Sequence, residues 1–165
     1  MSYTIWIEGL DIAESRLGCS LPNLPKGFTH FRTLFFHGEA DIEGSDNATH
    51  SNPHTFEVVR DGLITSIKFS LVNRGQAITS ECESFNEAIL YVGDMRVGSA
   101  ALANAQAMTT SGIAPCALSY ERMDSNLFIP IGEGQVIKAF HGYDGNQAAY
   151  TQRPAYHIQV YIVEK

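Results

Sequence analysis

Histidine and carboxylate side chains gather in the first third of the chain, where their types suit a metal ion. His50, His54 and Glu57 follow one another closely, with His37 and Glu39 upstream. Neutral imidazole with a carboxylate is a ligand set for zinc or iron. However, His50 lies among turn-forming residues and His54 follows a proline, which favours solvent-facing loop histidines. We therefore expect no metal site, and the candidates for one would be His50, His54 and Glu57.

A second group of polar side chains, at residues 141–147, suits a sugar. Sugar hydroxyls need paired donors and acceptors on a stiff loop, and the C–H side of the ring needs an aromatic face. The alternative is a plain turn between strands, in which glycines relieve backbone strain. We expect no cofactor, although oxygen atoms of Asp144 and Asn146 could hold Ca²⁺. The candidate ligand-binding residues are His141, Tyr143, Asp144, Asn146 and Gln147.

Motifs of nucleophilic, metal-hydrolytic and nucleotide chemistry are absent from the sequence. It has no G-x-S-x-G, H-E-x-x-H or P-loop motif, and no G-x-G-x-x-G opening a helix after a strand. Cys82 lies between two glutamates, which disfavour the reactive thiolate. Paired acids for glycoside hydrolysis are defined by a spatial separation that nothing in the sequence selects. We therefore predict that the protein is not an enzyme.

Composition and charge narrow the class of protein. The 165 residues are 44% hydrophobic and 18% charged, which is typical of a folded protein, and we expect a single domain over residues 1–165. The net charge of −7 argues against nucleic acid, because Lys and Arg supply most of the affinity for phosphates. No stretch is long and apolar enough for a membrane span, and we expect no signal peptide. Three well-separated cysteines favour a reducing compartment.

The candidate metal-binding and sugar-binding side chains must be positioned by β-strands. In DGLITSIKFSLVNRG, residues 61–75, apolar and polar side chains alternate, and a period of two indicates a strand with one wet face. Turn-forming residues flank this segment on both sides. The same pattern predicts strands near residues 3–8, 31–37, 55–60, 87–92, 117–122, 126–131, 136–143 and 155–163.

Helix is scarce in this sequence. Asp11 is expected to cap a short helical turn over residues 12–17. The small-residue run GSAALANAQAM, which starts at Gly98, is helical by propensity, with a loop or a strand against a close neighbour as alternatives. Residues 38–54 are rich in turn-forming residues and are predicted to be a surface loop.

Eight or nine short strands at regular spacing fit two antiparallel sheets packed face to face. We therefore predict an all-β jelly-roll or Greek-key sandwich with at most one or two short helices. The segment at residues 61–75 carries one core row, shifted across Thr65, and the last strand carries another. The predicted core rows are Leu63, Ile67, Phe69 and Leu71, and Ile158, Val160 and Ile162.

The placing of strands and turns resembles the jelly-roll modules of phage virion proteins, such as tail-fibre heads and capsid decoration or fibre proteins. The matching features are turns at Asp61-Gly62, Gly93-Asp94 and Gly132-Glu133-Gly134, each joined to an alternating strand, and a strand at the end. The resemblance covers residues from Thr55 onward. It implies a virion subunit that is assembled in the cytoplasm. Its partners would be copies of itself, as a trimer or larger, with capsid or tail proteins and a host glycan. The charge and the lack of a long apolar stretch argue against nucleic acid and a membrane as partners.

Two further resemblances imply other functions. IPIGEGQVIKAFHGYDGN, residues 129–146, is similar to the closing strands of jacalin-like β-prism lectins, which implies a free lectin with its sugar site at residues 141–147. The residues after Gly142 depart from that family's GxxxD loop. The spacing of His50 and His54 resembles a cupin metal site, although cupins place their first two histidines one residue apart.

Overall fold

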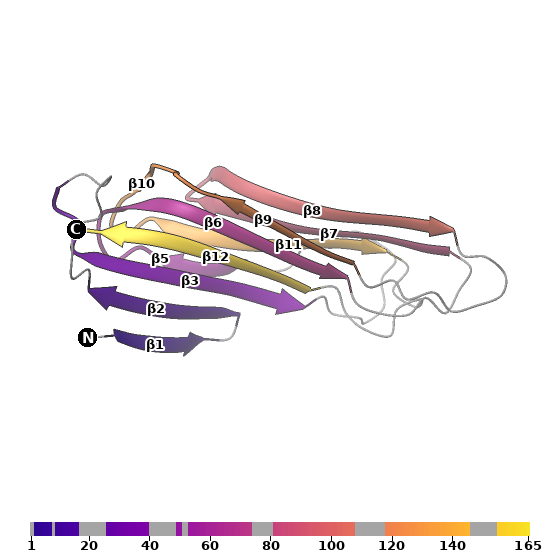
Figure 1. Cartoon of the computed structure of the whole chain (residues 1–165), viewed down its shortest axis with the longest axis horizontal. Coiled ribbons are helices and arrows are strands. Elements are labelled where there is room, and N and C mark those ends of the chain that lie inside the picture. Colours follow the sequence, from indigo (N-terminus) through magenta and orange to yellow (C-terminus); the bar gives the residue numbers. More distant parts are fainter. Residues whose placement is uncertain are drawn as a thin grey trace.

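The computed structural model is all-β, with its strands arranged in two antiparallel sheets (Figure 1). The backbone is described for residues 2–7, 9–16, 26–39, 49–50, 53–73, 81–107, 118–145 and 155–165. These residues form no helix, and so none that could span a membrane. The predicted all-β sandwich of two antiparallel sheets is confirmed.

Seven strands of the described part of the chain form sheet A. Their order is β1-β2-β3-β12-β6, and the outer edge of β6 pairs with β9 along one part and with β10 along another. Neighbouring strands in this sheet are antiparallel throughout. The strands are β1 (Ser2–Ile7), β2 (Leu10–Arg16), β3 (His30–Glu39), β6 (Gly62–Asn73), β9 (Leu118–Asp124), β10 (Ile129–Ile131) and β12 (Ala155–Glu164).

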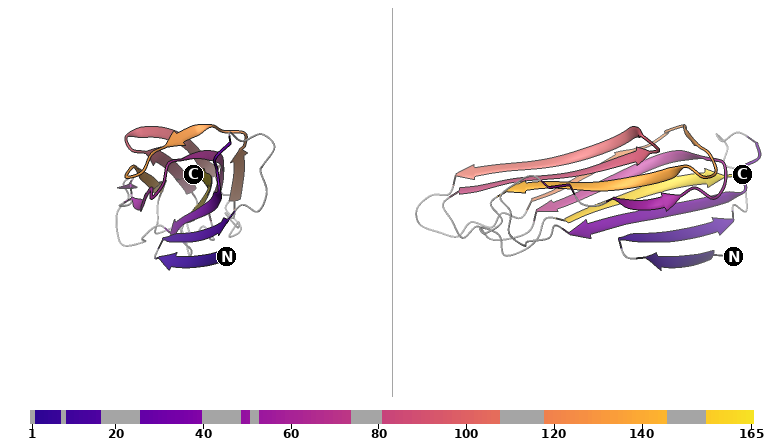
Figure 2. Two further views of the ribbon diagram at one scale, coloured as in Figure 1. Left: turned by 90° about the vertical axis from the view of Figure 1, so that its left-hand side faces the viewer. Right: turned by 180° about the vertical axis from the view of Figure 1, so that it is seen from behind.

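Among the residues that the structure describes, five strands form sheet B, which covers the inner face of sheet A (Figure 2). Strand β11 pairs with the short strands β4 and β5 on one side and with β7 on the other, and β8 follows β7 at the edge. The strands are β4 (Thr49–His50), β5 (His54–Glu57), β7 (Glu81–Val92), β8 (Met95–Ala107) and β11 (Val136–Gly145).

The strand pairing identifies the sandwich as a jelly roll. Strand β3 pairs with β12, β5 with β11, β6 with β9 and β10, and β7 with β8. Early strands thus pair with late ones, as in a long hairpin that has been rolled up so that successive strands pass between two sheets. Strands β1 and β2 extend sheet A beyond this roll (Figure 1).

The core lies between the sheets and combines bulky side chains with small ones. Phe36, Phe69 and Ile158 of sheet A are fully buried, while Ala88 and Ala139 lie among the core residues of sheet B. Burying each large side chain contributes about 1.5–3 kcal/mol. The core of the sandwich therefore depends on two unequal faces that fit together.

Strand β8 shows why a run of small residues is not a helix here. A Cβ atom on Gly98 would lie 2.9 Å from Cζ of Phe69, so only glycine lets this aromatic ring approach the strand. Ala100, two residues on, is buried in the same row. Among the three interpretations of this run, the strand against a close neighbour is correct, because tertiary packing overrides helix propensity.

The predicted helical turn over residues 12–17 is wrong. These residues belong mainly to β2, whose register with β3 pairs Ile12 with Leu34. Leu10 and Ile12 are buried, whereas Asp11 between them is not. The period of two decides the structure, because this strand has a sheet edge to join and a core to cover.

One loop and one core position also differ from the sequence-based expectation. The predicted loop at residues 38–54 contains the short strand β4 and the start of β5, and residues 40–48 and 51–52 lie outside the described residues. In the first core row, Ile64 takes the place predicted for Leu63, which is only partly buried. The cause is a bulge, because β12 pairs Tyr161 with Ser66 but Ile162 with Ile64, leaving Thr65 as an extra residue.

Candidate functional site

The outer face of sheet B contains a hollow of about 340 Å³, which we call the sheet B hollow. It is open to solvent, and it combines two aromatic rings, an aliphatic side chain, two charged groups and a glycine. Its lining residues are Ile89, Tyr91, Gly93, Asp94, Lys138 and Phe140.

The register of β7 and β11 builds the floor of the sheet B hollow. Tyr91 stands opposite Lys138, and Ile89 stands opposite Phe140. Leu90, which lies between Ile89 and Tyr91, is buried in the core, so the alternation of the strand places its neighbours on the outer face. The rings of Tyr91 and Phe140 meet edge to face, with centroids 5.5 Å apart and planes at 77°.

The turn between β7 and β8 closes one end of the sheet B hollow. Gly93 has a φ of 59°, a left-handed conformation that suits glycine, and its backbone nitrogen donates to the carbonyl oxygen of Val136 at 2.8 Å. Nζ of Lys138 lies 3.4 Å from Oδ1 of Asp94, whose side chain is fully exposed. Such an exposed ion pair contributes little to stability, which leaves both groups available to a ligand.

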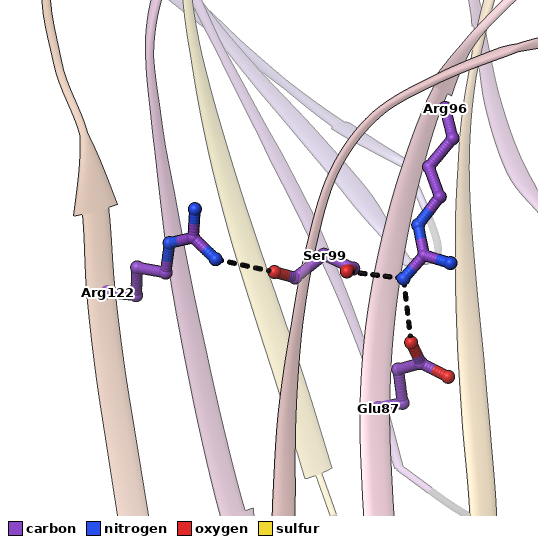
Figure 3. Close-up of polar contacts among 4 residues, drawn as sticks. All are labelled: Glu87, Arg96, Ser99 and Arg122. Carbon is purple, nitrogen blue, oxygen red and sulfur yellow. Dashed lines mark hydrogen bonds and ion pairs between the residues drawn. The ribbon is translucent and has the colours of Figure 1, made fainter.

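Hydrogen bonds join side chains of β7 and β8 close to Tyr91 in the register (Figure 3). Arg96 stands opposite Tyr91 in the register, and its guanidinium donates to Glu87 at 3.0 Å and to the hydroxyl of Ser99. From β9, Arg122 donates to the carbonyl oxygen of Ser99 at 3.2 Å. Because β8 and β9 are edge strands of different sheets, this last bond ties the two sheets together along one edge.

A second polar cluster lies inside the sandwich. Nε2 of His141, on β11, is 2.8 Å from Oδ1 of Asn86, on β7. The Asn86 amide nitrogen donates across to sheet A, to the carbonyl oxygens of Ala155 at 3.1 Å and Val72 at 3.4 Å. The amide oxygen of Asn86 is therefore the acceptor, so Nε2 of His141 carries the hydrogen. The ring of Tyr156 lies 4.8 Å from that of His141.

Burial controls the ionisation of this interior cluster. It lowers the pKa of His141 from 6.5 to about 4, with a further contribution from nearby His54. Burial also raises the pKa of Tyr156 above its usual range, and within the described residues the hydroxyl of Tyr156 has no hydrogen-bond partner. Both groups are therefore neutral at pH 7.

The predicted sugar site is only partly within the described residues. His141 is 1% exposed and faces the interior, so it does not belong to a surface loop. Tyr143 and Asp144 belong to β11 and stand opposite Asn86 and Phe85, so the strand predicted at residues 136–143 continues into the expected turn. Asn146 and Gln147 lie outside the described residues. A sugar site at Tyr143, Asp144, Asn146 and Gln147 stays a prediction, as does Ca²⁺ at Asp144 and Asn146.

The metal-ligand candidates do not share one face of the sandwich. His54 stands opposite Ala139 in the inward row, whereas Glu57 is exposed and stands opposite Val136. His50 stands opposite Gly142 on the short strand β4. Within the described ranges, no group of three or more His, Cys, Asp or Glu side chains could hold a metal ion. Strand alternation separates His54 from Glu57, because the spacing between them is an odd number of residues.

Sequence reasoning did not single out the sheet B hollow, although a signal for it exists. Alternation in residues 87–92 places Ile89 with Tyr91, and alternation in residues 136–143 places Lys138 with Phe140. Each pair is ordinary for a strand surface taken alone. The pairing of β7 with β11, which the sequence does not specify, brings them together.

Comparison with known proteins gives a likeness of fold only. No protein-family model matches the chain, and no curated protein matches it. A solved structure of the VP2 subviral particle of infectious bursal disease virus matches with a TM-score of 0.36 and 14% identity over 95% of this chain and 43% of that chain. The Gx strain of the same virus matches with a TM-score of 0.31 and 14% identity, over 93% of this chain and 38% of that chain. This chain thus spans less than half the length of these viral proteins, neither of which is a phage protein.

Proposed function

We propose that this protein is a non-enzymatic structural subunit of a particle, of the decoration or fibre type found in virions, and that it assembles with copies of itself. The observation that supports the proposal is a group of aromatic side chains on the outer face of sheet A. We call this group the sheet A aromatic face. It consists of Phe31, Phe35, His157 and Tyr161.

The sheet A aromatic face lies on two paired strands, β3 and β12. The rings of Phe35 and His157 are stacked, with centroids 5.9 Å apart and planes at 9°. The rings of Phe31 and Tyr161 have centroids 6.2 Å apart. All four side chains are partly exposed. Because the strands have neighbours on both sides, these rings are held on a rigid surface.

Polar pairs border this face on both sides. His37 of β3 lies 3.3 Å from Asp11 of β2, and Lys68 of β6 lies 3.3 Å from Glu121 of β9. An interface commonly has a centre enriched in aromatic side chains and a polar rim. Rigid aromatic side chains are also the residues that most often dominate binding energy. This arrangement supports contact with another copy of the chain through sheet A.

Light scattering after size exclusion, with electron microscopy of the same fractions, tests this proposal. We expect the wild-type chain to form a trimer or a larger assembly. Phe35→Glu should shift it towards the monomer, because the carboxylate would lose its water in the interface. Circular dichroism should show that the β-sheet signal is retained.

The matched control is Phe128→Glu, at an exposed phenylalanine outside the sheet A aromatic face. We expect this variant to assemble like the wild type. A wild-type chain that stays monomeric at every concentration would contradict the proposed function. Equal loss of assembly in both variants would contradict the assignment to the sheet A aromatic face.

A further inference from the structure

We propose that the sheet B hollow binds a neutral hexopyranose residue, the six-membered ring of a sugar, with its C–H face against Tyr91 and Phe140. This inference goes beyond the particle role, because it concerns the opposite sheet and needs no assembly. It also differs from the sugar site predicted at residues 141–147.

The size of the sheet B hollow fits one sugar ring. Its volume of about 340 Å³ lies at the low end of the range of roughly 300–1,000 Å³ that is usual for small-molecule sites. A site of this size holds one ring and does not enclose a longer ligand. Gly93 leaves its rim open, because among the described residues no atom beyond its two chain neighbours lies within 4 Å of the position that a Cβ would occupy. The rest of a glycan could leave the hollow past this glycine.

The aromatic floor suits the apolar side of a pyranose. Tyr91 and Phe140 stand nearly at right angles, with planes at 77°, so one ring face and one ring edge form a corner. Ile89 lies directly opposite Phe140 and is almost fully buried beneath this surface. A sugar ring has C–H groups on one side and hydroxyls around its edge, and aromatic side chains with a polar tip complement both.

Asp94 and Lys138 at the rim suit the hydroxyl groups of a sugar and disfavour a charged ligand. The Asp94 carboxylate can accept hydrogen bonds from several sugar hydroxyls, and the Lys138 ammonium can donate to sugar oxygens. The two groups lie 3.4 Å apart, so their charges largely cancel within the hollow. The whole chain carries a net charge of −7, which further disfavours an anion such as a phosphate. A neutral sugar meets these conditions.

Two neighbouring contacts keep the sheet B hollow preformed. The guanidinium of Arg96, opposite Tyr91, is fixed by Glu87 and Ser99 (Figure 3). The backbone bond from Gly93 to Val136 fixes the turn that carries Asp94. A preformed site loses less conformational entropy on binding, which matters for a ligand as small as one sugar.

The experiment is an NMR titration of the full chain with three probes, methyl β-galactopyranoside, methyl β-glucopyranoside and methyl α-mannopyranoside. We expect at least one to bind saturably in the millimolar range, with saturation transfer strongest from the protein to one C–H face of the sugar. Chemical shifts should change at Tyr91, Phe140 and the turn at Gly93. Tyr91→Ala and Asp94→Ala should each weaken binding about tenfold or more, which corresponds to about 1.4 kcal/mol.

Asp94→Ala keeps the test falsifiable, because this exposed turn residue can change without disturbing the core. The matched control is Tyr120→Ala, an exposed tyrosine on β9, which should bind like the wild type.

The absence of saturable binding of all three probes to the folded protein would overturn the inference. So would binding that is lost in Asp144→Ala but kept in Tyr91→Ala and Asp94→Ala, which would favour the site at residues 141–147. Concentration-dependent shifts at Tyr91 without any sugar would instead assign the hollow to contact between copies, and would equally overturn it.

Discussion

At the residue scale, the sandwich encloses an ion pair as well as an apolar core. Arg32 of β3 lies 3.2 Å from Glu164 of β12, and the two side chains are 6% and 0% exposed. The guanidinium also lies 5.1 Å from the ring centroid of Phe56, on the opposite sheet. Two charges removed from water are tolerated only when they compensate each other. The alternation of the last strand does not predict the ion pair, because it indicates only that residue 164 lies in the inward-facing row.

Replacing one partner of this buried pair should be costly. Glu164→Gln keeps the size of the side chain but removes the charge that faces Arg32, so we expect a loss of about 3–5 kcal/mol in the free energy of unfolding. Urea unfolding monitored by circular dichroism measures this loss of unfolding free energy. The control is Asp61→Asn, whose partner Lys165 lies 3.8 Å away in an exposed pair, and we expect a change below about 1 kcal/mol. Similar losses in both variants would show that burial of the Arg32 pair does not matter.

The interior histidine predicts how stability depends on pH. Burial lowers the pKa of His141 to about 4 in the folded chain, from 6.5, so the unfolded chain takes up the proton first as the pH falls. The contribution of neutral His141 is therefore complete above pH 6.5 and declines between pH 6.5 and 4, by about 3 kcal/mol in total.

Urea unfolding at a series of pH values from neutral to pH 4 checks this prediction. His141→Gln should be less stable than the wild type at neutral pH but should lose less stability on acidification, because it cannot take up the proton. His30→Gln, at a partly exposed histidine, is the matched control and should follow the wild-type profile. A wild-type profile that stays flat across this range would contradict the assignment to His141.

At the element scale, β8 shows how packing selects a strand from an ambiguous sequence. Its small residues form a surface into which sheet A inserts larger side chains, and Gly98 takes the ring of Phe69. Propensity alone favours a helix for this run, but a helix would leave β7 without its neighbour and Phe69 without its surface. The requirement to cover the core thus outweighs local preference.

A single methyl group at Gly98 tests this packing. Gly98→Ala should cost about 1–3 kcal/mol of unfolding free energy, because the new Cβ would lie 2.9 Å from Cζ and 3.2 Å from Cε2 of Phe69. The double variant with Phe69→Leu should be less destabilised than the sum of the two single variants. Ala101→Val, at an exposed position on the same strand, should be nearly neutral. Additive effects of Gly98→Ala and Phe69→Leu in urea unfolding would contradict the contact.

At the scale of the whole molecule, side-chain hydrogen bonds join the two sheets in addition to the apolar core. Asn86 of sheet B donates to carbonyl oxygens on β6 and β12, and Arg122 of sheet A donates to β8. The hydrogen bonds of Asn86 lie in the interior, and that of Arg122 lies along one edge of the sandwich. A sandwich fixed at both places can present its two outer faces, with the sheet A aromatic face on one and the sheet B hollow on the other, in a constant relation.

Hydrogen exchange tests the interior hydrogen bonds of Asn86. Asn86→Leu keeps a similar volume but removes the bonds to Val72 and Ala155, so we expect a loss of about 1–3 kcal/mol and faster exchange where β6 pairs with β12. Ser66→Ala, on the outer side of β6, should leave exchange unchanged. Unchanged exchange in Asn86→Leu would show that the apolar core alone holds the sheets together.

The sequence by itself determined the class of fold and most of the strands, but not β2, β4 or β8. Alternation placed Ile67, Phe69 and Leu71 correctly in one core row and Ile158, Val160 and Ile162 in another, because a strand has a fixed period of two. It failed at Leu63, since a bulge inserts one residue and reverses the faces beyond it. Such an irregularity depends on the partner strand and leaves no clear local signal.

Only the tertiary structure decided where the chemically useful side chains lie. His141 has the composition of a surface site around it in the sequence, yet it faces Asn86 and Tyr156 inside the sandwich. The sheet B hollow is built by Tyr91 and Phe140, which are 49 residues apart and meet through the pairing of β7 with β11. The physical reason is that periodicity fixes which face a side chain takes along one strand, whereas the choice of neighbouring strand is made by the packing of the whole core.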